Sequence, residues 1–327
     1  MEQYIQNLQD FMVLIRCYTF NHSEYITDTL NGFTMQQTNF PFIIVLVDDA
    51  STDGEQNLIK QYVKDYFEDS ILQKESDYAH LTFTQHKTNQ NCYLAVYYLK
   101  ENHYSKKRKK TPYLKPWRKK CKYEALCEGD DYWIDPLKLK KQVDFLERHP
   151  DYSLCFHNAV VFYDDIPKLP RFFCNIIESR DVSLEEITDS WIIPTASMLY
   201  RRNVIEDYPQ WTKQIYSGDL TLQLIAYSKG KLYYMNQIMS FYRMTYKTDS
   251  ASSTIKGKAD FVYAQHALLY KLYDEYTNYI YHDILSKRID FKEKESKFVK
   301  YRKKGIIYTI LRMPLYCMKK LLKRPIP

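Results

Sequence analysis

The chain has 327 residues, 45% of them hydrophobic, which is enough for one large core or for a core with an appendage. Its seven cysteines are odd in number and include no CxxC pair, which argues against a disulfide framework or a zinc site and favours a reducing compartment. The first residues, MEQYIQNLQD, carry acids and no apolar core, so we do not expect a secretory signal there.

The formal charge of +7 is unevenly distributed along the chain. Residues 100–122 hold 11 Lys or Arg and one Glu, and residues 297–327 hold 10 Lys or Arg and no acid. These two segments leave a charge of −13 on the remaining residues. The pattern indicates an acidic globular body with two basic patches, rather than a uniformly basic protein.

The first half alternates apolar, β-branched runs with helical patterns, which is typical of an α/β domain. We expect strands at residues 11–18, 42–47, 81–85 and 123–127, and helices at residues 23–35, 54–67, shortly after 93, and 136–148. Asn21 and Glu24 have the spacing of a capping box for the first of these helices. Asp135 would cap the last one, with Pro136 at its first position. The basic stretch 106–122, broken by two prolines, is predicted to be a surface loop.

The second half has a mixed pattern. We expect strand-like segments at 153–163, 195–200 and 233–243, a capped helical turn at 183–186, a helix at 218–229, and helices rich in Tyr and Lys from about 256. The predicted domains are therefore 1–250 and 251–327. Only seven glycines are present, with no GxGxxG or GxxxxGK[ST] pattern, which argues against a dinucleotide-binding or P-loop protein.

Acidic residues follow two of the predicted parallel strands directly. Asp48-Asp49 comes after one strand, and Glu128 with Asp130-Asp131 comes after another. Ligands of open α/β sheets bind outside the carboxyl ends of the strands, so both clusters would face one crevice. Their carboxylates suit Mg²⁺ or Mn²⁺, which keeps its waters and also holds a diphosphate. A solvated turn or a helix cap explains one such pair, but two pairs at equivalent strand ends favour a shared site.

Three segments resemble family-2 glycosyltransferases of the GT-A fold: VLIRCYTFNHSEYI, IIVLVDDASTDG and YEALCEGDDYWIDPLKLKKQVDFLERHPDYSLCFHNA. They occur in the family's order over roughly Phe11 to Arg243, and VDDASTDG together with EGDDYWIDPLKL is the specific combination. The resemblance implies a Rossmann-like, mixed and mostly parallel sheet flanked by helices, with a C-terminal helical extension. It also implies a bacterial enzyme of surface-polysaccharide assembly.

The resemblance implies a donor pocket as well. Asp49 would hydrogen-bond the base of a nucleotide-sugar, for which a UDP-sugar is the expected donor. Thr19, Asn21 and Asp48 would belong to the same pocket, and Asp130 would lie near the ribose.

The remaining implied roles concern the metal and the reaction. Asp131, with Asp130, would contact a divalent Mn or Mg cation, and Glu128 fills the first position of the family's DxD pattern. The catalytic base would be Asp219, at the start of a helix; a helix cap fits this spacing equally well, and the resemblance favours the base. Arg243 resembles the family's cation near the diphosphate, although a plain surface arginine fits its position too.

The implied reaction inverts the anomeric centre. The cation would neutralise the leaving diphosphate while Asp219 takes the proton of an attacking hydroxyl on a saccharide or lipid-linked acceptor. The sequence departs from the family at Tyr18, where Pro is common, and at Glu124, which would need a partner if its strand is buried. The basic stretch 106–122 is also more charged than the family usually shows.

The C-terminal tail has the pattern of a basic amphipathic helix, which suits an anionic membrane surface. Its apolar face would hold Ile307, Ile310, Leu311, Met318, Leu321 and Leu322, opposite Arg312, Lys319, Lys320, Lys323 and Arg324. The longest uncharged run is shorter than the ~20 residues of a spanning helix. We expect a cytoplasmic protein, peripheral on the inner face of the plasma membrane; a tail helix packed on the domain is the alternative.

A second class of function is a nucleic-acid- or phospholipid-binding protein that uses the basic stretch and tail without catalysis. Lysines interleaved with Tyr113 and Trp117 resemble a surface that follows phosphates. The −13 charge on the rest of the chain and the lack of a known binding module argue against a specific nucleic-acid partner.

Overall fold

The computed structural model describes residues 2–164, 167–244, 257–313 and 315–317, and the chain divides into two compact units. Unit 1 comprises residues 1–207 and 229–245, and unit 2 comprises residues 208–228 and 246–327. Unit 2 thus takes in the segment 208–228, which the sequence analysis placed in the first domain. The predicted boundary at 250 lies outside the described residues and stays a prediction.

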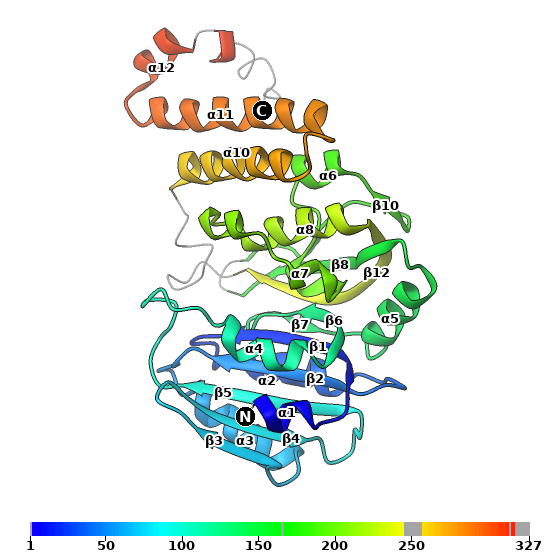
Figure 1. The fold of residues 1–327 in the computed structure, drawn as a ribbon. Helices are drawn as coiled ribbons and strands as arrows, with labels where there is room; N and C mark the ends of the chain where they lie inside the picture. The colour runs from blue at the N-terminus through cyan, green and yellow to red at the C-terminus, as the bar shows by residue number, and fades with distance from the viewer. Residues whose placement is uncertain (1, 165–166, 245–256, 314, 318–327) are drawn as a thin grey trace. The chain divides into compact units, whose positions relative to one another are not determined.

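Unit 1 is built on a twelve-stranded mixed sheet, counted over the described residues (Figure 1). The strand order is β10-β12-β8-β11-β6-β1-β2-β5-β4-β3, with β7 added to β12 and β9 added to β8. The strands are β1 (Phe11–Thr19), β2 (Phe42–Asp48), β3 (Leu72–Glu75), β4 (Ala79–Gln85), β5 (Cys92–Leu99), β6 (Cys121–Leu126), β7 (Tyr132–Trp133), β8 (Tyr152–Tyr163), β9 (Arg171–Phe172), β10 (Arg180–Val182), β11 (Leu199–Arg201) and β12 (Lys231–Met244).

Helices cover both faces of this sheet. One face packs against α2 (Ile26–Thr34), α3 (Glu55–Tyr66) and α5 (Lys138–Arg148). The other packs against α1 (Glu2–Gln6) and α4 (Thr111–Arg118). The remaining short elements of unit 1 are α6 (Leu184–Asp189), α7 (Asn203–Glu206) and the 3₁₀ turn η1 (Thr195–Ser197). Burial on both faces explains why all seven residues of β2 are buried and why its first six are all apolar.

The centre of the sheet is parallel, which brings the predicted site to one edge. β1 pairs in parallel with β2 and β6, and β2 pairs in parallel with β5. The carboxyl ends of these four strands therefore lie along one edge, and the loops that carry Asp48-Asp49 and Asp130-Asp131 begin there. The predicted α/β class, with a large and mostly parallel sheet flanked by helices, is confirmed.

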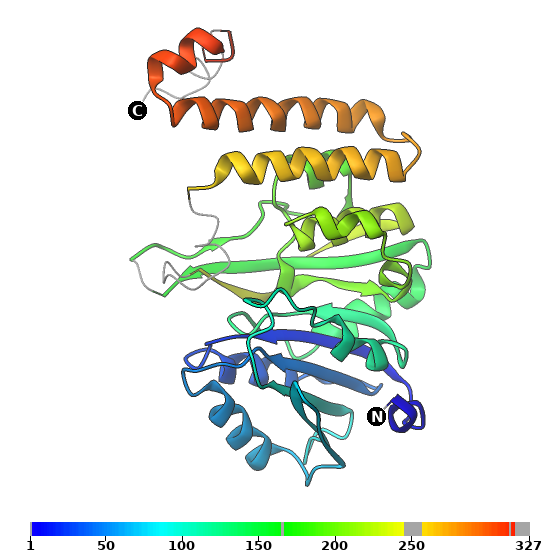
Figure 2. The same ribbon diagram turned by 60° about the vertical axis from the view of Figure 1, so that its left-hand side comes forward.

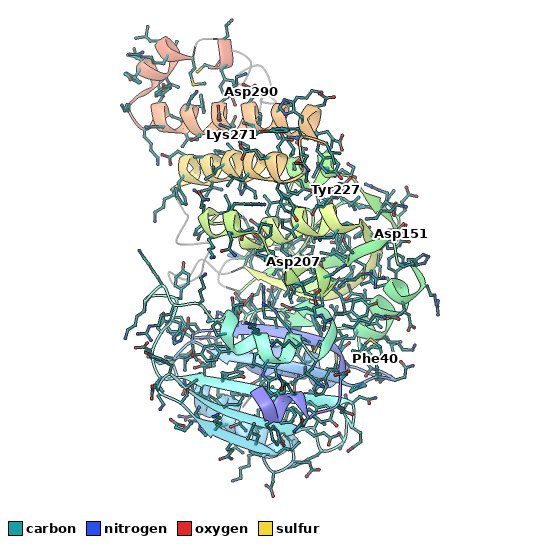
Figure 3. The ribbon with its side chains drawn as sticks, viewed as in Figure 1. Phe40, Asp151, Asp207, Tyr227, Lys271 and Asp290 are labelled. Atoms are coloured by element: carbon teal, nitrogen blue, oxygen red, sulfur yellow. The ribbon has the colours of Figure 1, made fainter. Side chains whose placement is uncertain are left out.

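Unit 2 is helical, as predicted for the C-terminal part. It holds α8 (Gly218–Lys229), α10 (Ala259–Tyr276), α11 (His282–Arg302), α12 (Ile306–Arg312) and the 3₁₀ turn η2 (Gln210–Gln214). Figures 1 and 2 show α10 and α11 side by side. Figure 3 labels Lys271 on α10 and Asp290 on α11; Lys271 forms an ion pair with Glu293 across the two helices. The predicted tail helix extends past Arg312 into residues 318–327, which are outside the described part of the chain.

Two expectations about elements were wrong. The short helix expected after Tyr93 is strand β5, which lies between β2 and β4 and is almost entirely buried. A short apolar run of this length does not separate strand from helix by its periodicity. The basic stretch 106–122 is not only a loop, because α4 spans Thr111–Arg118 with Leu114 and Trp117 buried. These two apolar side chains explain why the segment folds onto the sheet despite its charge.

Two of the three predicted helix caps also differ. α2 begins at Ile26 after Tyr25, without a side-chain cap, so the expected capping box of Asn21 and Glu24 does not form. α5 begins at Lys138, and Asp135 Oδ1 accepts from the backbone N of Leu137 ahead of it, 2.8 Å away. The capping box of Ser183 and Glu186 at α6 is confirmed.

Candidate functional site

Glu55 connects the two loops that follow β1 and β2. It is the first residue of α3 and is fully buried. Its carboxylate accepts from the Thr19 hydroxyl, from the His22 backbone N at 2.9 Å and from the Ser51 hydroxyl at 2.8 Å. Burial raises the pKa of Glu55. One carboxylate therefore fixes the end of β1 against the start of α3.

Asn21 strengthens the connection between the same two loops. Its backbone N donates to Ser51 Oγ at 2.9 Å, and its Oδ1 accepts from the backbone N of Thr52 at 2.8 Å. Asn21 and Ala50 both adopt left-handed backbone angles, with φ of 56° and 62°. Non-glycine residues seldom adopt such angles unless their surroundings hold them there. Thr19 and Asn21, predicted together, do lie in one hydrogen-bonded cluster.

Asp48 ends β2 with one satisfied and one unsatisfied carboxylate oxygen. Its Oδ1 accepts from the backbone N of Ser51 at 3.1 Å and from the side-chain amide of Gln56. Its Oδ2 is buried and has no hydrogen-bond partner among the described residues. Burial raises the pKa of Asp48. A buried carboxylate oxygen without a donor is unfavourable, so the site has capacity for a further hydrogen bond here.

Asp49 is enclosed by the basic segment. Its carboxylate is 1% exposed and accepts from the backbone N of His103 at 2.6 Å, from that of Tyr104 at 3.1 Å and from Lys110 Nζ at 2.9 Å. Asn102 Nδ2 also donates to the Asp49 carbonyl at 3.0 Å. The structure thus places Asp49 at the predicted edge, where its carboxylate anchors the segment 102–110. Nothing in the sequence pairs these positions, because they are more than fifty residues apart.

The acidic loop after β6 packs directly on the end of β1. Gly129 donates its backbone N–H to the Tyr18 carbonyl at 3.0 Å. A Cβ atom at Gly129 would lie 2.2 Å from Thr19 Oγ1 and 2.9 Å from His22 Nδ1. The hydroxyl of Thr29, on α2, donates to the carbonyls of Gly129 at 3.0 Å and of Asp131 at 2.7 Å. The structure therefore brings the Asp130-Asp131 loop and the Thr19 loop into contact.

The carboxylates of the acidic loop repel one another. Burial, followed by the neighbouring charges of Asp130 and Glu128, raises the pKa of Asp131 well above its usual value. Burial and the charge of Asp130 also raise the pKa of Glu128, although Arg16 lies 3.9 Å from its carboxylate. A cation among these groups would relieve the repulsion, because it favours the ionised carboxylates.

The residues present fit a divalent cation. Among the described residues, no three His, Cys, Asp or Glu side chains converge as a complete metal site. Mg²⁺ needs no such cage, because it commonly takes one or two carboxylates and completes its shell with waters and substrate phosphates. Asp130 and Asp131 supply hard oxygen ligands of this kind, in a loop whose electrostatics favour added positive charge.

Arg243, in β12, is neither a surface arginine nor a free cation. Its side chain is 8% exposed, and its guanidinium forms ion pairs with Asp28 and Asp164. It also donates from Nε to the Asp130 carbonyl at 2.9 Å. The structure thus brings Arg243 to the acidic loop, with its side chain largely buried.

The sequence analysis expected that Glu124 would need a partner if its strand is buried. The structure provides Arg118 as that partner. Glu124 lies on β6 opposite Leu14 of the parallel strand β1 and is 2% exposed. Arg118 of α4 forms a two-point hydrogen bond with its carboxylate. The residue that compensates the buried acid comes from the basic stretch, which the sequence analysis treated as loop.

Asp219 belongs to unit 2, where it is the second residue of α8 and is half-buried. Its Oδ1 accepts from the backbone N of Leu220 at 2.9 Å. The start of α8 is joined to α10 by the backbone N of Tyr216, which donates to Gln265, and by a hydrogen bond of 3.0 Å between Ser217 and His266. The other site residues are in unit 1, so the role of Asp219 stays a prediction.

Sequence reasoning missed two residues that build this site. Glu55 looked like an ordinary acid in the first turn of a helix, where it favours the helix dipole. Lys110 looked like one of many solvated lysines. Glu55 is distinguished by its position directly after VDDASTDG. Lys110 is distinguished only by its contact with Asp49, which is not visible in a single sequence.

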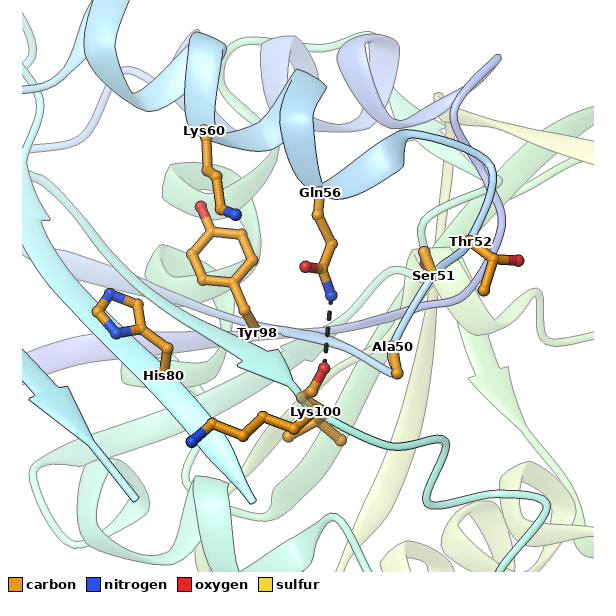
Figure 4. A pocket seen from close by; sticks show the side chains of 9 residues that line it. Ala50, Ser51, Thr52, Gln56, Lys60, His80, Tyr98 and Lys100 are labelled. Atoms are coloured by element: carbon orange, nitrogen blue, oxygen red, sulfur yellow. Dashed lines mark hydrogen bonds between the residues drawn. The ribbon is translucent and has the colours of Figure 1, made fainter. Parts of the chain in front are cut away.

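A cavity of about 520 Å³ opens beside the loop that follows β2 (Figure 4). The walls are the loop 50–52, Gln56 and Lys60 of α3, His80 of β4, Tyr98 of β5, and Lys100, which directly follows β5. The side chain of Gln56 crosses toward β5 and donates to the Leu99 carbonyl at 3.5 Å. This volume is within the range of small-molecule sites. None of the predicted site residues lines it, so it is not the predicted pocket.

Comparison with known proteins gives a family match for part of the chain. Residues 17–80 match the profile described as glycosyl transferase family 2. An uncharacterized protein of Mycobacterium tuberculosis is 32% identical over 227 residues, which cover 69% of this chain and 56% of that protein. The chain therefore aligns with little more than half the length of its curated relatives. The matched segment includes Thr19, Asn21, Asp48, Asp49 and Glu55.

Among solved structures, S. aureus TarS in complex with UDP-GlcNAc is 17% identical, with a TM-score of 0.51 over 79% of this chain and 66% of that one. The mannosyltransferase PcManGT from Pyrobaculum calidifontis, in complex with GDP-Man and Mn²⁺, is 12% identical, with a TM-score of 0.48 over 98% of this chain and 86% of that one. The likeness to TarS shows the fold, which is GT-A. The fold and the family match together support a glycosyltransferase of family 2.

Proposed function

We propose that this chain is a family-2 glycosyltransferase that moves a sugar from a nucleotide-sugar to a hydroxyl acceptor. One observation carries the proposal: the loop of Glu128, Asp130 and Asp131 packs against the Thr19 loop at the carboxyl ends of parallel strands. This is the edge at which open α/β sheets bind ligands. The match of residues 17–80 to the family supports it independently.

In this proposal the donor lies across the loops that follow β1, β2 and β6. Thr19, Asn21, Asp48 and Asp49 form the base side, and Asp130 lies near the ribose. The Asp49 carboxylate, which bonds to Lys110 and to two backbone N–H groups, would exchange one of these partners for the base. The unpaired Oδ2 of Asp48 is an acceptor available to a ligand N–H or hydroxyl after local adjustment. The expected donor is a UDP-sugar.

A divalent cation, Mg²⁺ or Mn²⁺, would be held by Asp130 and Asp131. When bound it would supply positive charge that stabilises the leaving diphosphate. The two adjacent carboxylates in the loop after β6, which packs on the end of β1, are the feature of this chain that supports cation binding. The other residues of the loop hold these carboxylates in place and exclude water around them.

Asp219 is the proposed general base. It would accept the proton of the attacking hydroxyl, which enters on the face of the sugar opposite the leaving group, so the anomeric centre is inverted. The hydrogen bonds of Tyr216 and Ser217 to α10 fix the start of α8, which carries Asp219. The acceptor in this proposal is a saccharide or a lipid-linked saccharide of cell-surface polysaccharide synthesis.

The tail of unit 2 supports a place at a membrane surface. Four aliphatic side chains of α12, Ile306, Ile307, Ile310 and Leu311, are between 48% and 77% exposed. The segment from residue 297 onward carries ten basic residues and no acid. None of the helices in the described part of the chain has the length and apolar character needed to cross a bilayer. We propose a cytoplasmic enzyme that binds peripherally to the anionic inner face of the plasma membrane.

Nucleotide titration tests the proposed function. UDP added to the parent protein should bind more tightly with Mn²⁺ than without, and Asp131→Ala should remove that enhancement. Asp144→Ala is the matched control, because Asp144 is an acid of α5 that pairs with Lys140 on its own helix. Asp219→Ala should bind UDP normally and stop transfer. If neither Mn²⁺ nor the Asp131→Ala substitution changes the affinity for UDP, the assignment of Asp131 as a metal ligand is wrong.

Vesicle binding tests the membrane proposal separately. The parent should sediment with vesicles that contain phosphatidylglycerol and not with pure phosphatidylcholine vesicles. Replacing Ile307 and Leu311 by Ser should reduce sedimentation while leaving UDP binding intact. The alternative, a nucleic-acid-binding protein without catalysis, predicts instead DNA binding that persists at moderate salt and no response to nucleotide-sugars.

A further inference from the structure

Arg243 bonds to both aspartates of the acidic pair. Its Nε donates to the Asp130 carbonyl at 2.9 Å, and its backbone N donates to Asp131 Oδ1 at 2.8 Å. One residue of β12 therefore determines the path of the backbone at Asp130 and the orientation of the carboxylate at Asp131. The backbone bond persists with any residue except proline at position 243, so the side chain contributes the bond to Asp130.

Two further acids hold the guanidinium in this position. Its Nη1 donates to Asp164 Oδ2 at 2.7 Å, and its Nη2 lies 3.2 Å from Asp28 Oδ2. Asp28 is on α2, and Asp164 directly follows β8. Each of the three guanidinium nitrogens thus has an acceptor on a different element. A planar guanidinium suits this arrangement, because its donors point outward in fixed directions.

Aromatic rings surround the remaining surface of the guanidinium. Its central carbon lies 4.2 Å from the centre of the Tyr25 ring and 4.7 Å from that of Phe162. These contacts and the two carboxylates leave the side chain 8% exposed. Two negative charges against one positive charge also cancel the attraction that Arg243 would exert on a diphosphate. Burial, geometry and charge all argue against direct contact with the donor.

We propose that Arg243, anchored by Asp28 and Asp164, is a positioning residue that holds the Asp130-Asp131 loop in its binding shape and does not touch the diphosphate. This rests on the proposed function only in assuming that the loop faces the donor. It assigns a role to Asp28 and Asp164, which lie outside the acidic motif.

A positioning role for Arg243 and a direct contact between Arg243 and the diphosphate predict opposite effects of substituting Asp28 and Asp164. If Arg243 contacts the diphosphate, the double variant Asp28→Asn/Asp164→Asn frees the guanidinium and leaves UDP affinity equal or higher. If Arg243 positions the loop, the same variant loosens it and weakens UDP binding by about tenfold, the loss expected when two charge-assisted hydrogen bonds become weaker neutral ones. Asp144→Asn, at a half-buried acid of α5 that pairs with Lys140, is the control and should leave the affinity unchanged.

Hydrogen exchange of the free protein gives a readout that needs neither nucleotide nor metal. Arg243→Ala should speed exchange of the amides of residues 129–133 by about tenfold or more, because the bond that holds the Asp130 carbonyl is lost. Arg243→Lys should lie between parent and Ala, because one ammonium cannot reach all three acceptors. Amides of β2 serve as the internal control for global stability.

The outcomes separate this proposal from the proposed function. Unchanged exchange at 129–133 in Arg243→Ala, or unchanged UDP affinity in the Asn double variant, overturns the positioning role. A parent protein that binds no UDP overturns the proposed function, and the exchange experiment still decides whether Arg243 holds the loop. If Arg243→Ala does not fold, the Asn double variant, which keeps the arginine, provides the same exchange measurement.

Discussion

Arg118 donates two hydrogen bonds to the buried carboxylate of Glu124, from Nε to Oε2 at 2.6 Å and from Nη2 to Oε1 at 2.7 Å. Arg16 of β1 lies 3.9 Å from the same carboxylate. Burial alone would raise the pKa of Glu124, but the charge and hydrogen bonds of Arg118, together with Arg16, outweigh it and hold that pKa below its usual value. The folded state thus favours the ionised acid.

Replacing Arg118 by Ala should destabilise the fold strongly. The change leaves Glu124 charged inside the sheet without its principal partner, and breaking a buried pair on one side costs about 3–5 kcal/mol in the free energy of unfolding. Urea unfolding followed by tryptophan fluorescence measures this cost. Because the pKa of Glu124 is lowered by folding, its contribution is present above its unfolded pKa and is lost as the pH falls through the folded value.

The double variant Arg118→Leu/Glu124→Leu is the control for this prediction. It removes both charges and should recover much of the stability, because two apolar side chains need no partners. If Arg118→Ala unfolds at the urea concentration of the parent, the two-point bond contributes nothing to stability.

Gly129→Ala should weaken nucleotide binding while the fold persists. The added Cβ would lie 2.2 Å from Thr19 Oγ1 and 2.6 Å from Thr19 Cβ, so the acidic loop and the β1 loop must separate. Alanine can adopt the backbone conformation of Gly129, because the φ angle of Gly129 is not positive. The steric clash with Thr19 is therefore the whole effect. We expect UDP affinity to fall by about tenfold or more, with a smaller change in the unfolding midpoint.

Gly218→Ala is the matched control, since a Cβ there meets no atom within 4 Å. It should bind UDP as the parent does. A Gly129→Ala protein with normal UDP affinity would mean that the packing of these two loops does not matter for the donor.

The parts of the fold that the sequence predicts are those determined by local pattern. β2 is an apolar run that ends in an acid, and acids follow the mixed run of β6 closely. The existence of both strands and the edge at which the acids lie therefore follow from local pattern and from the geometry of parallel sheets. β5 was missed because its run, CYLAVYYL, becomes a strand only through pairing with β2 and β4. The local pattern of such a short apolar run fits a strand or a helix, so the pairing decides between them.

The candidate site was predicted less completely than the fold. The acids were found by their positions after strands, but the partners of those acids come from distant segments. Lys110 bonds to Asp49 and Arg243 bonds to the Asp130 carbonyl over separations of 61 and 113 residues. A single sequence contains no local signal for such pairs. The same limit applies to Arg118, which pattern reasoning treated as part of a solvated loop.

Lys138 should make the stability of the protein depend on pH in an unusual direction. It is fully buried at the start of α5, with its Nζ 3.9 Å from the centre of the Trp133 ring and 2.8 Å from Gln142 Oε1. Burial lowers its pKa from 10.5 to about 7. Between these two values the unfolded chain binds a proton that the folded chain does not, so the free energy of unfolding rises with pH in this window.

Lys138→Met should remove that rise. At or below about pH 7 the variant should be more stable than the parent, and the difference should shrink toward about pH 10. Urea unfolding at three pH values across the window measures it. Lys140→Met is the control, because Lys140 lies on the same helix and its side chain is 41% exposed. Its free energy of unfolding should change with pH as that of the parent does. A constant difference between Lys138→Met and the parent would show that Lys138 is charged throughout.

Two substitutions of Glu55, by Gln and by Ala, should have different effects on UDP affinity. The Glu55 carboxylate accepts from the Thr19 hydroxyl on one side and from the His22 backbone N and the Ser51 hydroxyl on the other. The His22 N–H is a donor only, so an acceptor must remain on that side. The Thr19 hydroxyl can turn and accept instead.

Glu55→Gln should therefore be tolerated, with its amide oxygen toward His22 and Ser51 and its NH₂ toward Thr19. We expect less than about threefold loss of UDP affinity for this variant, and about tenfold or more for Glu55→Ala, which leaves the buried donors of both loops unpaired. Hydrogen exchange at the amides of Asn21 and His22, which donate into this network, should rise in Ala and stay near the parent in Gln. Glu68 is an acid just beyond the other end of α3, and Glu68→Ala is the matched control. It should change neither UDP affinity nor exchange at these amides. Equal losses in Gln and Ala would instead mean that the negative charge of Glu55, rather than its capacity to accept hydrogen bonds, holds the loops together.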